Sequence, residues 1–332
     1  MRAAIFNGPK DVQVGHRPDP VIQERTDARR GGHTVAVSIL RPVVATVVNR
    51  LMAAGCVTAD EEAEELVAAA PDDDTLELWI RRREQGEPPA WITGTMQFCG
   101  RTLHVDQGVY VPRCQSEELV RRASKLLPRN GGRAVDLCTG AGTIAAHLMA
   151  EVPDATVVGV DIDERAAMCA RRNGVFAVVA DLGEPLRPET FDVVAAVAPY
   201  VPTGKLGLLP ADVQRYEPRL ALDGGDDGLD LVRRIVATAA RLLRPGGWLL
   251  TELGGEQDKA LAATLGASGF SHVSAWFDED GDLRGLAAQA TGSASRRGVA
   301  ATRGDDRARP RSPSGRAPGG PGEDRGAGPE CG

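Results

Sequence analysis

The chain is poor in aromatic residues and has no long apolar segment. Phe, Trp and Tyr make up 4% of its 332 residues, so its core must be built mainly from Val, Leu, Ile and Ala. No apolar run reaches about 18 residues, the length that a membrane-spanning helix needs. The N-terminus also lacks the charged-then-apolar pattern of a signal peptide. We therefore expect a soluble cytoplasmic protein with no membrane partner.

Paired cysteines are also missing. The six cysteines are scattered, none forms a C-x-x-C pair, and no histidine stands at ligand spacing from them. Because zinc sites use closely spaced Cys and His ligands, this pattern predicts no metal site. Positive charge is not in excess either, since the net charge is -7. A general nucleic-acid binder usually shows a basic face, so we expect no nucleic-acid partner. We also expect the protein to be a monomer.

Composition divides the chain into five segments. Residues 1–36 look like an appended N-terminal segment that starts with a short hairpin and is poorly ordered. Residues 37–93 carry apolar side chains at helical spacing and predict a small helical domain. Residues 94–112 predict a linker and a β-hairpin. Residues 113–290 alternate apolar strands with helices, whereas residues 291–332 are too poor in large apolar residues to fold and are predicted to be disordered.

The segment 113–290 predicts an α/β domain. Near-continuous apolar strands separated by helices indicate a parallel sheet that is covered on both faces. The last two strands flank a hairpin turn at 278–282, so one edge strand is expected to be antiparallel. The predicted strands are 134–137, 156–160, 177–180, 191–196, 247–251, 271–277 and 283–288. We therefore expect a Rossmann-like, mostly parallel sheet of seven strands.

A glycine-rich stretch, Val135–Ala145, links the first of these strands to the next helix. Gly140 and Gly142 allow backbone conformations that a β-carbon would block, which lets a ligand lie against the main chain. Asp161 ends the second strand, where its carboxylate can accept hydrogen bonds from both hydroxyls of a ribose. The pattern predicts a nucleotide-like ligand, and taken alone it allows either NAD or S-adenosylmethionine.

Two further acids distinguish these ligands. Asp136 lies just before the glycines, and Asp181 follows the third strand, where the amine of an adenine could donate to it. S-adenosylmethionine carries an ammonium group, a ribose diol and an adenine amine but no phosphate, and carboxylates suit all three groups. A pyrophosphate would instead favour the bare N–H groups of a helix N-terminus. This part of the chain therefore resembles the class I methyltransferases that use S-adenosylmethionine.

The order of motifs further along resembles the release factor glutamine methyltransferases. Members of that family methylate the side-chain nitrogen (N5) of a glutamine in peptide chain release factors. The resemblance covers about residues 40–290, and Glu217–Asp230 is its most specific part. The other stretches that carry it are Gly86-Glu87-Pro88 with Gly94, Phe98-x-Gly100, Val111-Pro112-Arg113 with Glu117, and Pro245-Gly246-Gly247. In that family an N-terminal bundle docks the release factor, and an Asn-Pro-Pro-Tyr motif holds the target glutamine.

The resemblance implies a protein-(glutamine-N5) methyltransferase with S-adenosyl-L-methionine as its cofactor and a release factor as its partner. The catalytic residues would be the four that stand at the Asn-Pro-Pro-Tyr motif: Val197, Ala198, Pro199 and Tyr200. The residues expected to hold the cofactor are Asp136, Cys138, Thr139, Gly140, Gly142, Asp161, Ile162, Asp181 and Leu182.

The chain departs from the family motif at two of these positions. Val197 stands where the family has Asn, and Ala198 stands where it has the first Pro. Val197 offers no side-chain acceptor for an amide hydrogen, and losing one such bond costs about 1–3 kcal/mol, or about 10- to 150-fold in rate. Two alternatives therefore stay open. One is a binding protein with weakened or lost catalysis, and the other is a methyltransferase for adenine or cytosine amines in nucleic acid.

Overall fold

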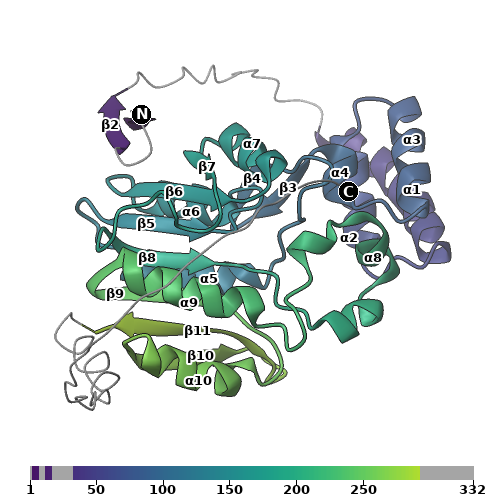
Figure 1. The fold of residues 1–332 in the computed structure, drawn as a ribbon. Helices are drawn as coiled ribbons and strands as arrows, with labels where there is room; N and C mark the ends of the chain where they lie inside the picture. Colours follow the sequence, from purple (N-terminus) through teal and green to yellow (C-terminus); the bar gives the residue numbers. More distant parts are fainter. Residues whose placement is uncertain (1, 7–11, 17–32, 292–332) are drawn as a thin grey trace, which may run out of the picture.

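The computed structural model describes residues 2–6, 12–16 and 33–291, with side chains from residue 42 to 291 (Figure 1). The strands β1 (Arg2–Phe6) and β2 (Val12–His16) pair antiparallel, as the predicted N-terminal hairpin requires. The predicted disordered tail lies outside the described residues apart from its first residue, and so does most of the segment predicted to be poorly ordered.

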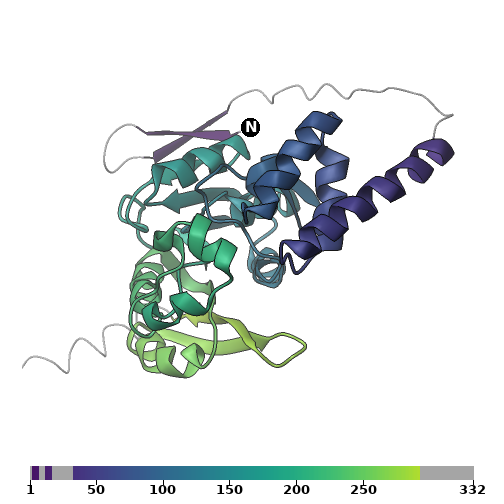
Figure 2. The same cartoon turned by 90° about the vertical axis from the view of Figure 1, so that its right-hand side faces the viewer.

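Three helices form a bundle beside one end of the sheet (Figures 1 and 2): α1 (His33–Ala53), α2 (Ala59–Ala69) and α3 (Asp73–Glu84). Apolar side chains at helical spacing meet at its centre and are almost completely buried, among them Val47, Leu51, Leu66 and Ile80. Although α1 has 21 residues, neither it nor any other helix in the described part of the chain is apolar enough to cross a membrane.

The stretch predicted as a turn-rich linker contains a short helix, α4 (Pro89–Thr93). Pro89 occupies its first turn, where the missing N–H of proline costs nothing. Trp91 in this helix is buried, and its Nε1 donates to the Val109 carbonyl at 2.9 Å. The linker is therefore a packed element between the bundle and the sheet. The predicted hairpin follows it as β3 (Thr95–Phe98) and β4 (Arg101–His104).

A seven-stranded sheet forms the centre of the α/β domain, in the order β10-β11-β9-β8-β5-β6-β7. Its strands are β5 (Arg133–Leu137), β6 (Thr156–Asp161), β7 (Ala177–Val179), β8 (Phe191–Ala196), β9 (Leu243–Glu252), β10 (Phe270–Phe277) and β11 (Leu283–Ala290). The pairs among β5 to β9 are parallel, and β11 runs against both of its neighbours beside the edge strand β10. The predicted Rossmann-like, mostly parallel fold is confirmed.

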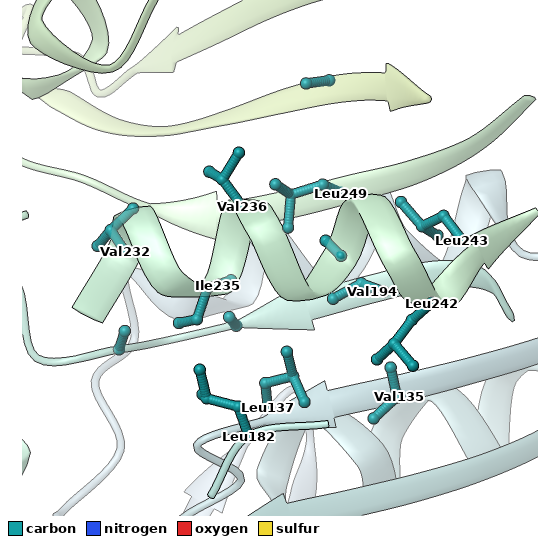
Figure 3. Close-up of a cluster of buried hydrophobic side chains, with 14 of the residues drawn as sticks. Val135, Leu137, Leu182, Val194, Val232, Ile235, Val236, Leu242, Leu243 and Leu249 are labelled. Atoms are coloured by element: carbon teal, nitrogen blue, oxygen red, sulfur yellow. The ribbon is translucent and has the colours of Figure 1, made fainter. Parts of the chain in front are cut away.

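Helices cover both faces of this sheet. One face packs against α5 (Ser116–Leu126), α6 (Thr143–Glu151) and α7 (Glu164–Arg172), and the other against α9 (Asp230–Leu242) and α10 (Gln257–Ala267). Figure 3 shows Val232, Ile235 and Val236 of α9 beside the strand that carries Val194. Because successive residues of the central strands β5, β6 and β8 alternate between two buried faces, these strands are mostly apolar.

Between β8 and α9 the chain leaves the sheet and reaches the bundle. This segment contains η1 (Thr203–Leu208), α8 (Ala211–Tyr216) and η2 (Arg219–Ala221). The Tyr216 hydroxyl donates to the Gln85 carbonyl at 3.0 Å, and Asp212 pairs with Arg83 at 3.5 Å. Two parts of the chain that are far apart in sequence thus meet, and Figure 1 shows α8 next to α2.

Candidate active site

A cavity of about 930 Å³ lies where the carboxyl ends of the parallel strands meet the bundle. Four of its wall residues follow or end these strands: Cys138 after β5, Asp161 in β6, Val197 after β8 and Glu252 in β9. The strand order reverses at β5 and β8, since β6 and β7 extend the sheet to one side and β9 to the other. Such a reversal opens a crevice at the carboxyl ends of the strands, which is where the cavity lies.

The opposite wall of the cavity comes from the bundle and the α8 segment. Residues 54–58 and 83–86 of the bundle line it, together with much of the segment 209–222. Two large apolar side chains on this wall are mostly exposed, Val57 at 97% and Leu220 at 64%. The cavity therefore extends from the strand ends to an apolar rim formed by Val57 and Leu220.

Four of the nine residues predicted to hold the cofactor line the cavity: Cys138, Gly140, Asp161 and Ile162. The two oxygens of Asp161 accept hydrogen bonds from the Gly140 N–H at 2.9 Å and the Asp163 N–H at 3.0 Å. Burial raises the pKa of Asp161, and these two N–H groups act in the opposite direction. Gly140 has a φ of +56° with open space beside it. This end of the cavity thus offers an oriented carboxylate next to bare backbone.

Asp136 and Thr139 lie behind the loop and do not line this cavity. The Thr139 hydroxyl donates to Asp136 Oδ2 at 2.6 Å, and the Ala145 N–H donates to the same oxygen at 3.3 Å. Burial raises the pKa of Asp136 to about 7. Its other oxygen, Oδ1, has no hydrogen-bond partner among the described residues. The carboxylate of Asp136 ties the glycine-rich loop to the first turn of α6.

The other three predicted cofactor residues are also absent from the wall of this cavity. Gly142 precedes α6 with a φ of +79°, and a β-carbon there would come within 2.8 Å of Ala170 Cβ. Asp181 is held by Arg234, whose Nη2 lies 2.8 and 2.7 Å from its two oxygens. The Leu182 side chain is buried in the core between the sheet and α9. Five of the nine residues thus make packing or pairing contacts away from the cavity.

All four predicted catalytic residues line the cavity, as a turn that follows β8. Gln257 holds this turn, because its Nε2 donates to the Tyr200 carbonyl at 2.9 Å. No donor among the described residues reaches the Ala198 carbonyl, so this oxygen can accept a hydrogen bond from a ligand. Val197 is half-buried and adds only apolar surface. The turn therefore offers a backbone acceptor and an aromatic ring to the cavity.

Glu252, which is not among the residues predicted from sequence, stands beside this turn. Its side chain is buried, and the hydroxyls of Ser116 and Tyr200 are hydrogen-bond donors to its carboxylate. Its Oε1 has no partner among the described residues. Burial raises the pKa of Glu252. Burial also raises the pKa of Tyr200, to about 12. An acid that ends an apolar strand is the signal that singled out Asp161, and the same signal could have found Glu252.

Arg113 lines the cavity and forms an ion pair with Glu217, which does not line it. The Glu217 side chain is almost completely buried, and the Arg113 guanidinium lies over the Tyr110 ring at 5.2 Å from its centroid. Burial raises the pKa of Glu217, and the charge of Arg113 opposes this shift. Both residues belong to the sequence stretches that carry the family resemblance. Their pairing could not be inferred there, because 104 positions separate them.

Comparison with known proteins agrees with this geometry. A family model described as a methyltransferase domain matches residues 134–209. The release factor glutamine methyltransferase of Geobacter sulfurreducens is 39% identical over 197 residues, which are 58% of this chain and 69% of that protein. The 4-amino-L-phenylalanine/4-methylamino-L-phenylalanine methyltransferase of Streptomyces pristinaespiralis is 38% identical over 239 residues, which are 68% of this chain and 81% of that protein.

Among solved structures, the protein-(glutamine-N5) methyltransferase (release factor-specific) from Alicyclobacillus acidocaldarius is 25% identical and covers 55% of this chain and 94% of its own. Its TM-score of 0.35 is too low to support an argument about function. The sequence relatives do support one, because identity near 39% over more than two thirds of a protein reflects common descent. The chain thus belongs to the release factor glutamine methyltransferase family, whose members are enzymes that use S-adenosyl-L-methionine.

Proposed function

We propose that this methyltransferase acts on the side-chain amide nitrogen of a glutamine in a peptide chain release factor. The observation that carries the proposal is the 39% identity with the Geobacter sulfurreducens enzyme of that name. The shape of the site supports it, since one cavity connects the glycine-rich loop with the turn after β8 and with a rim on the bundle. A protein loop that reaches past this rim would bring its glutamine to the turn.

The residues at the loop end suit S-adenosyl-L-methionine. Asp161 can accept hydrogen bonds from a ribose diol, because each of its oxygens keeps a lone pair beyond the backbone bond that it accepts. Ile162 is 57% exposed on the cavity wall and offers apolar surface to an adenine. The open space beside Gly140 leaves room for the ligand against the main chain. When bound there, the cofactor supplies an electrophilic methyl group on a sulfonium.

The turn after β8 suits the acceptor. The Ala198 carbonyl accepts one amide hydrogen, and the Tyr200 ring can lie against the flat amide group. An amide nitrogen is a poor nucleophile, because its lone pair is delocalised into the carbonyl, so the site must orient it toward the methyl group. Val197 cannot accept the second hydrogen through its side chain. We therefore expect slow turnover for an amide acceptor.

Labelled S-adenosylmethionine and a purified release factor test the proposal. Wild type should place label on a glutamine, and V197N should raise the rate by about 10- to 150-fold, because it restores an acceptor worth about 1–3 kcal/mol. A matched control is V273N, which makes the same exchange at an exposed position of β10 outside the cavity. This control should leave the rate unchanged. A release factor that stays unlabelled at high enzyme concentration with both wild type and V197N would contradict the proposal.

A second acceptor is favoured by a different observation. The Streptomyces pristinaespiralis relative, which matches over 81% of its length, is named for 4-amino-L-phenylalanine, an aromatic amine. An aromatic amine is flat like an amide and is a better nucleophile. Its lone pair is less delocalised than that of an amide, so its reactivity depends less on a second hydrogen-bond acceptor, which suits an apolar Val197.

The same assay with free 4-amino-L-phenylalanine distinguishes the two acceptors. If the aromatic amine is the better acceptor, wild type should methylate it faster than the release factor. In that case V197N should not increase the rate, because it adds a polar group that the amine does not need. A rate that increases with V197N for the release factor and stays near zero for the amine excludes the second acceptor.

A further inference from the structure

Glu252 combines three properties that a purely structural carboxylate rarely has. It lines the cavity, it is only 4% exposed, and its Oε1 has no hydrogen-bond partner among the described residues. A buried charged oxygen without a partner is expensive, because the group loses its hydration and gains nothing in return. A ligand that donates a hydrogen bond to this oxygen would remove that cost.

The position of Glu252 relates it to the missing motif asparagine. Ala196 of β8 and Thr251 of β9 are partners in the parallel register. The residues that follow these two in the chain, Val197 after β8 and Glu252 at the end of β9, both line the cavity. Neighbouring strands lie about 4.8 Å apart, so the carboxylate stands on the wall where Val197 provides no acceptor.

The groups that face Glu252 come from four elements. Ser116 of α5 and Tyr200 after β8 donate to it, and Arg284 of β11 and Tyr110 lie close enough to act on it electrostatically. Arg284 is itself paired with Asp278, with its Nε 2.7 Å from Oδ2. No cation among the described residues forms an ion pair with Glu252, which leaves its charge available for a ligand.

We propose that Glu252 is the proton acceptor of the methyl transfer and that the cavity takes an uncharged nitrogen acceptor with at least one N–H. The N–H donates to Glu252 Oε1 in the bound state. This inference rests on the proposed function only in requiring a nitrogen acceptor, and it holds for an amide and for an aromatic amine.

The acceptor nitrogen gains a methyl group and loses a proton. The nitrogen lone pair forms the new N–CH₃ bond while the S–CH₃ bond breaks and its electron pair stays on sulfur. The nitrogen then carries a positive charge, and its N–H bond breaks with the electron pair returning to nitrogen. The proton goes to Glu252, which leaves a neutral methylated product, a neutral thioether and a protonated carboxyl. Burial makes Glu252 a stronger base than an exposed glutamate, and the proton passes to water when the products leave.

The variant E252Q tests this role, because it keeps the size of the side chain and removes its basicity. Single-turnover methyl transfer is measured from about pH 5 to pH 9 with whichever of the two acceptors wild type methylates. The wild-type rate should fall as the pH falls through the pKa of Glu252, since only the ionised form accepts a proton. E252Q should be at least about 100-fold slower at high pH and should lose this dependence. A near wild-type rate with the same pH profile overturns the proposal.

Two measurements without turnover separate this role from a structural one. The affinity for S-adenosylhomocysteine, measured by calorimetry, should be the same for wild type and E252Q. The Tm of E252Q should be equal to or above that of wild type, because the variant removes a buried charge with an unpartnered oxygen. A Tm that falls by more than about 4 °C would show that Glu252 mainly holds Ser116 and Tyr200 in place, and it would overturn the proposal.

The control is D192N, which makes the corresponding exchange at a buried carboxylate whose contacts are complete. Asp192 accepts from the Arg133 N–H at 2.8 Å and pairs with Arg244 at 3.0 Å, and it lies outside the cavity. D192N should lower the Tm and leave the rate per folded molecule unchanged. If wild type methylates neither acceptor, the proposed function fails. In that case the Tm of E252Q still tests the role of Glu252. An unchanged or raised Tm supports the proposed role, and a lower Tm overturns it.

Discussion

Gly140 and Gly142 lie two positions apart in one loop, but they are required for different reasons. Both have a positive φ, at +56° and +79°, which a residue with a β-carbon adopts only at a cost. A β-carbon at Gly140 would meet open space on the cavity side. One at Gly142 would meet Ala170 Cβ at 2.8 Å and Val175 Cγ2 at 3.0 Å. Gly142 thus serves the packing of the loop on α7.

This difference predicts unequal effects of alanine. G140A should destabilise the protein by about 1 kcal/mol, the cost of the left-handed conformation alone. G142A adds a close contact with a buried helix and should cost about 3 kcal/mol or more. Urea unfolding of the two variants measures both values, and each serves as the control for the other. Equal losses would contradict the packing role of Gly142.

Asp136 should make stability depend on pH. Its pKa rises to about 7 because it is completely buried, whereas its ordinary value is 3.8. Between these values the folded state holds a proton that the unfolded state releases, so stability falls as the pH rises and the loss is complete above about pH 7. D136N should remove this pH-dependent loss of stability and be more stable than wild type by a few kcal/mol at pH 8. Urea unfolding at pH 4 and pH 8 checks this.

The decisive comparison for Asp136 is the change between the two pH values. D136N should lose less stability than wild type from pH 4 to pH 8, because asparagine does not titrate. A variant with the same pH dependence as wild type would show that Asp136 is not the group responsible.

Some of these residue roles could be predicted from sequence, and others could not. The position of Asp161 at a strand end predicts a carboxylate at the crevice, and the structure places it on the cavity wall. Asp136 and Leu137 are successive residues of β5, so their side chains point to opposite faces of the sheet. Leu137 packs on the face covered by α9, and Asp136 points to the face covered by α6. Asp181 is held by Arg234, 53 residues away, and no local pattern indicates such a pair.

At the scale of elements, Arg83 connects the bundle with α8. It is buried, its Nε lies 2.6 Å from Glu62 within the bundle, and its Nη2 lies 3.5 Å from Asp212 of α8. The first pair is short and shielded from water, whereas Asp212 is about one third exposed. Arg83 therefore belongs mainly to the bundle.

Two matched variants test this division. E62Q leaves a buried guanidinium with a weakened partner and should cost about 2–3 kcal/mol of stability. D212N removes a longer, partly exposed pair and should cost less than about 1 kcal/mol. Thermal or urea unfolding of the two variants gives the comparison. If D212N were the more damaging change, the contact between α8 and the bundle would be the stronger one.

Local signals predicted most elements but misjudged those that depend on distant partners. The Pro-Gly-Gly stretch after α9 suggests a turn before the strand, yet β9 begins at Leu243 and includes this stretch. β9 pairs with β8 before this stretch, at Leu243, and again after it, from Trp248 onward, with a register shift between Phe191 and Val193 of β8. Ser116 has the character of an N-cap. It is instead the first residue of α5, because Gln115 before it already has a helical backbone, and its hydroxyl contacts Glu252.

At the scale of the whole molecule, the rim of the cavity should distinguish a protein substrate from a small one. Val57 is 97% exposed on the bundle wall, where a bound release factor would cover it. V57D should then raise the KM for the release factor by about 10-fold, and it should not change the KM for 4-amino-L-phenylalanine. Steady-state kinetics with both acceptors measures this.

The control for the rim is L78D. Leu78 is 57% exposed on α3 and does not line the cavity, so the same kind of charge there should leave both KM values unchanged. An equal increase for V57D and L78D would point to a general effect of added charge on the bundle. That result would contradict docking at the rim.

The overall fold follows from sequence more readily than the site. Alternating apolar strands and helices leave few arrangements, and the right-handed crossover rule then places the strand ends on one edge. The cavity wall is different, because it needs the bundle, the α8 segment and four strand ends in one place. Contacts such as Tyr216 with Gln85 arise only after folding.

The contact between α8 and the bundle also gives the protein an optical reporter of its own. The Trp91 indole lies edge-on to the Tyr216 ring, with the centroids 6.3 Å apart, and Tyr216 is bonded to the bundle through Gln85. Any separation of α8 from the bundle would change the surroundings of this indole. The emission of Trp91, recorded in a variant whose other three tryptophans are replaced by phenylalanine, would therefore follow opening of the cavity in real time.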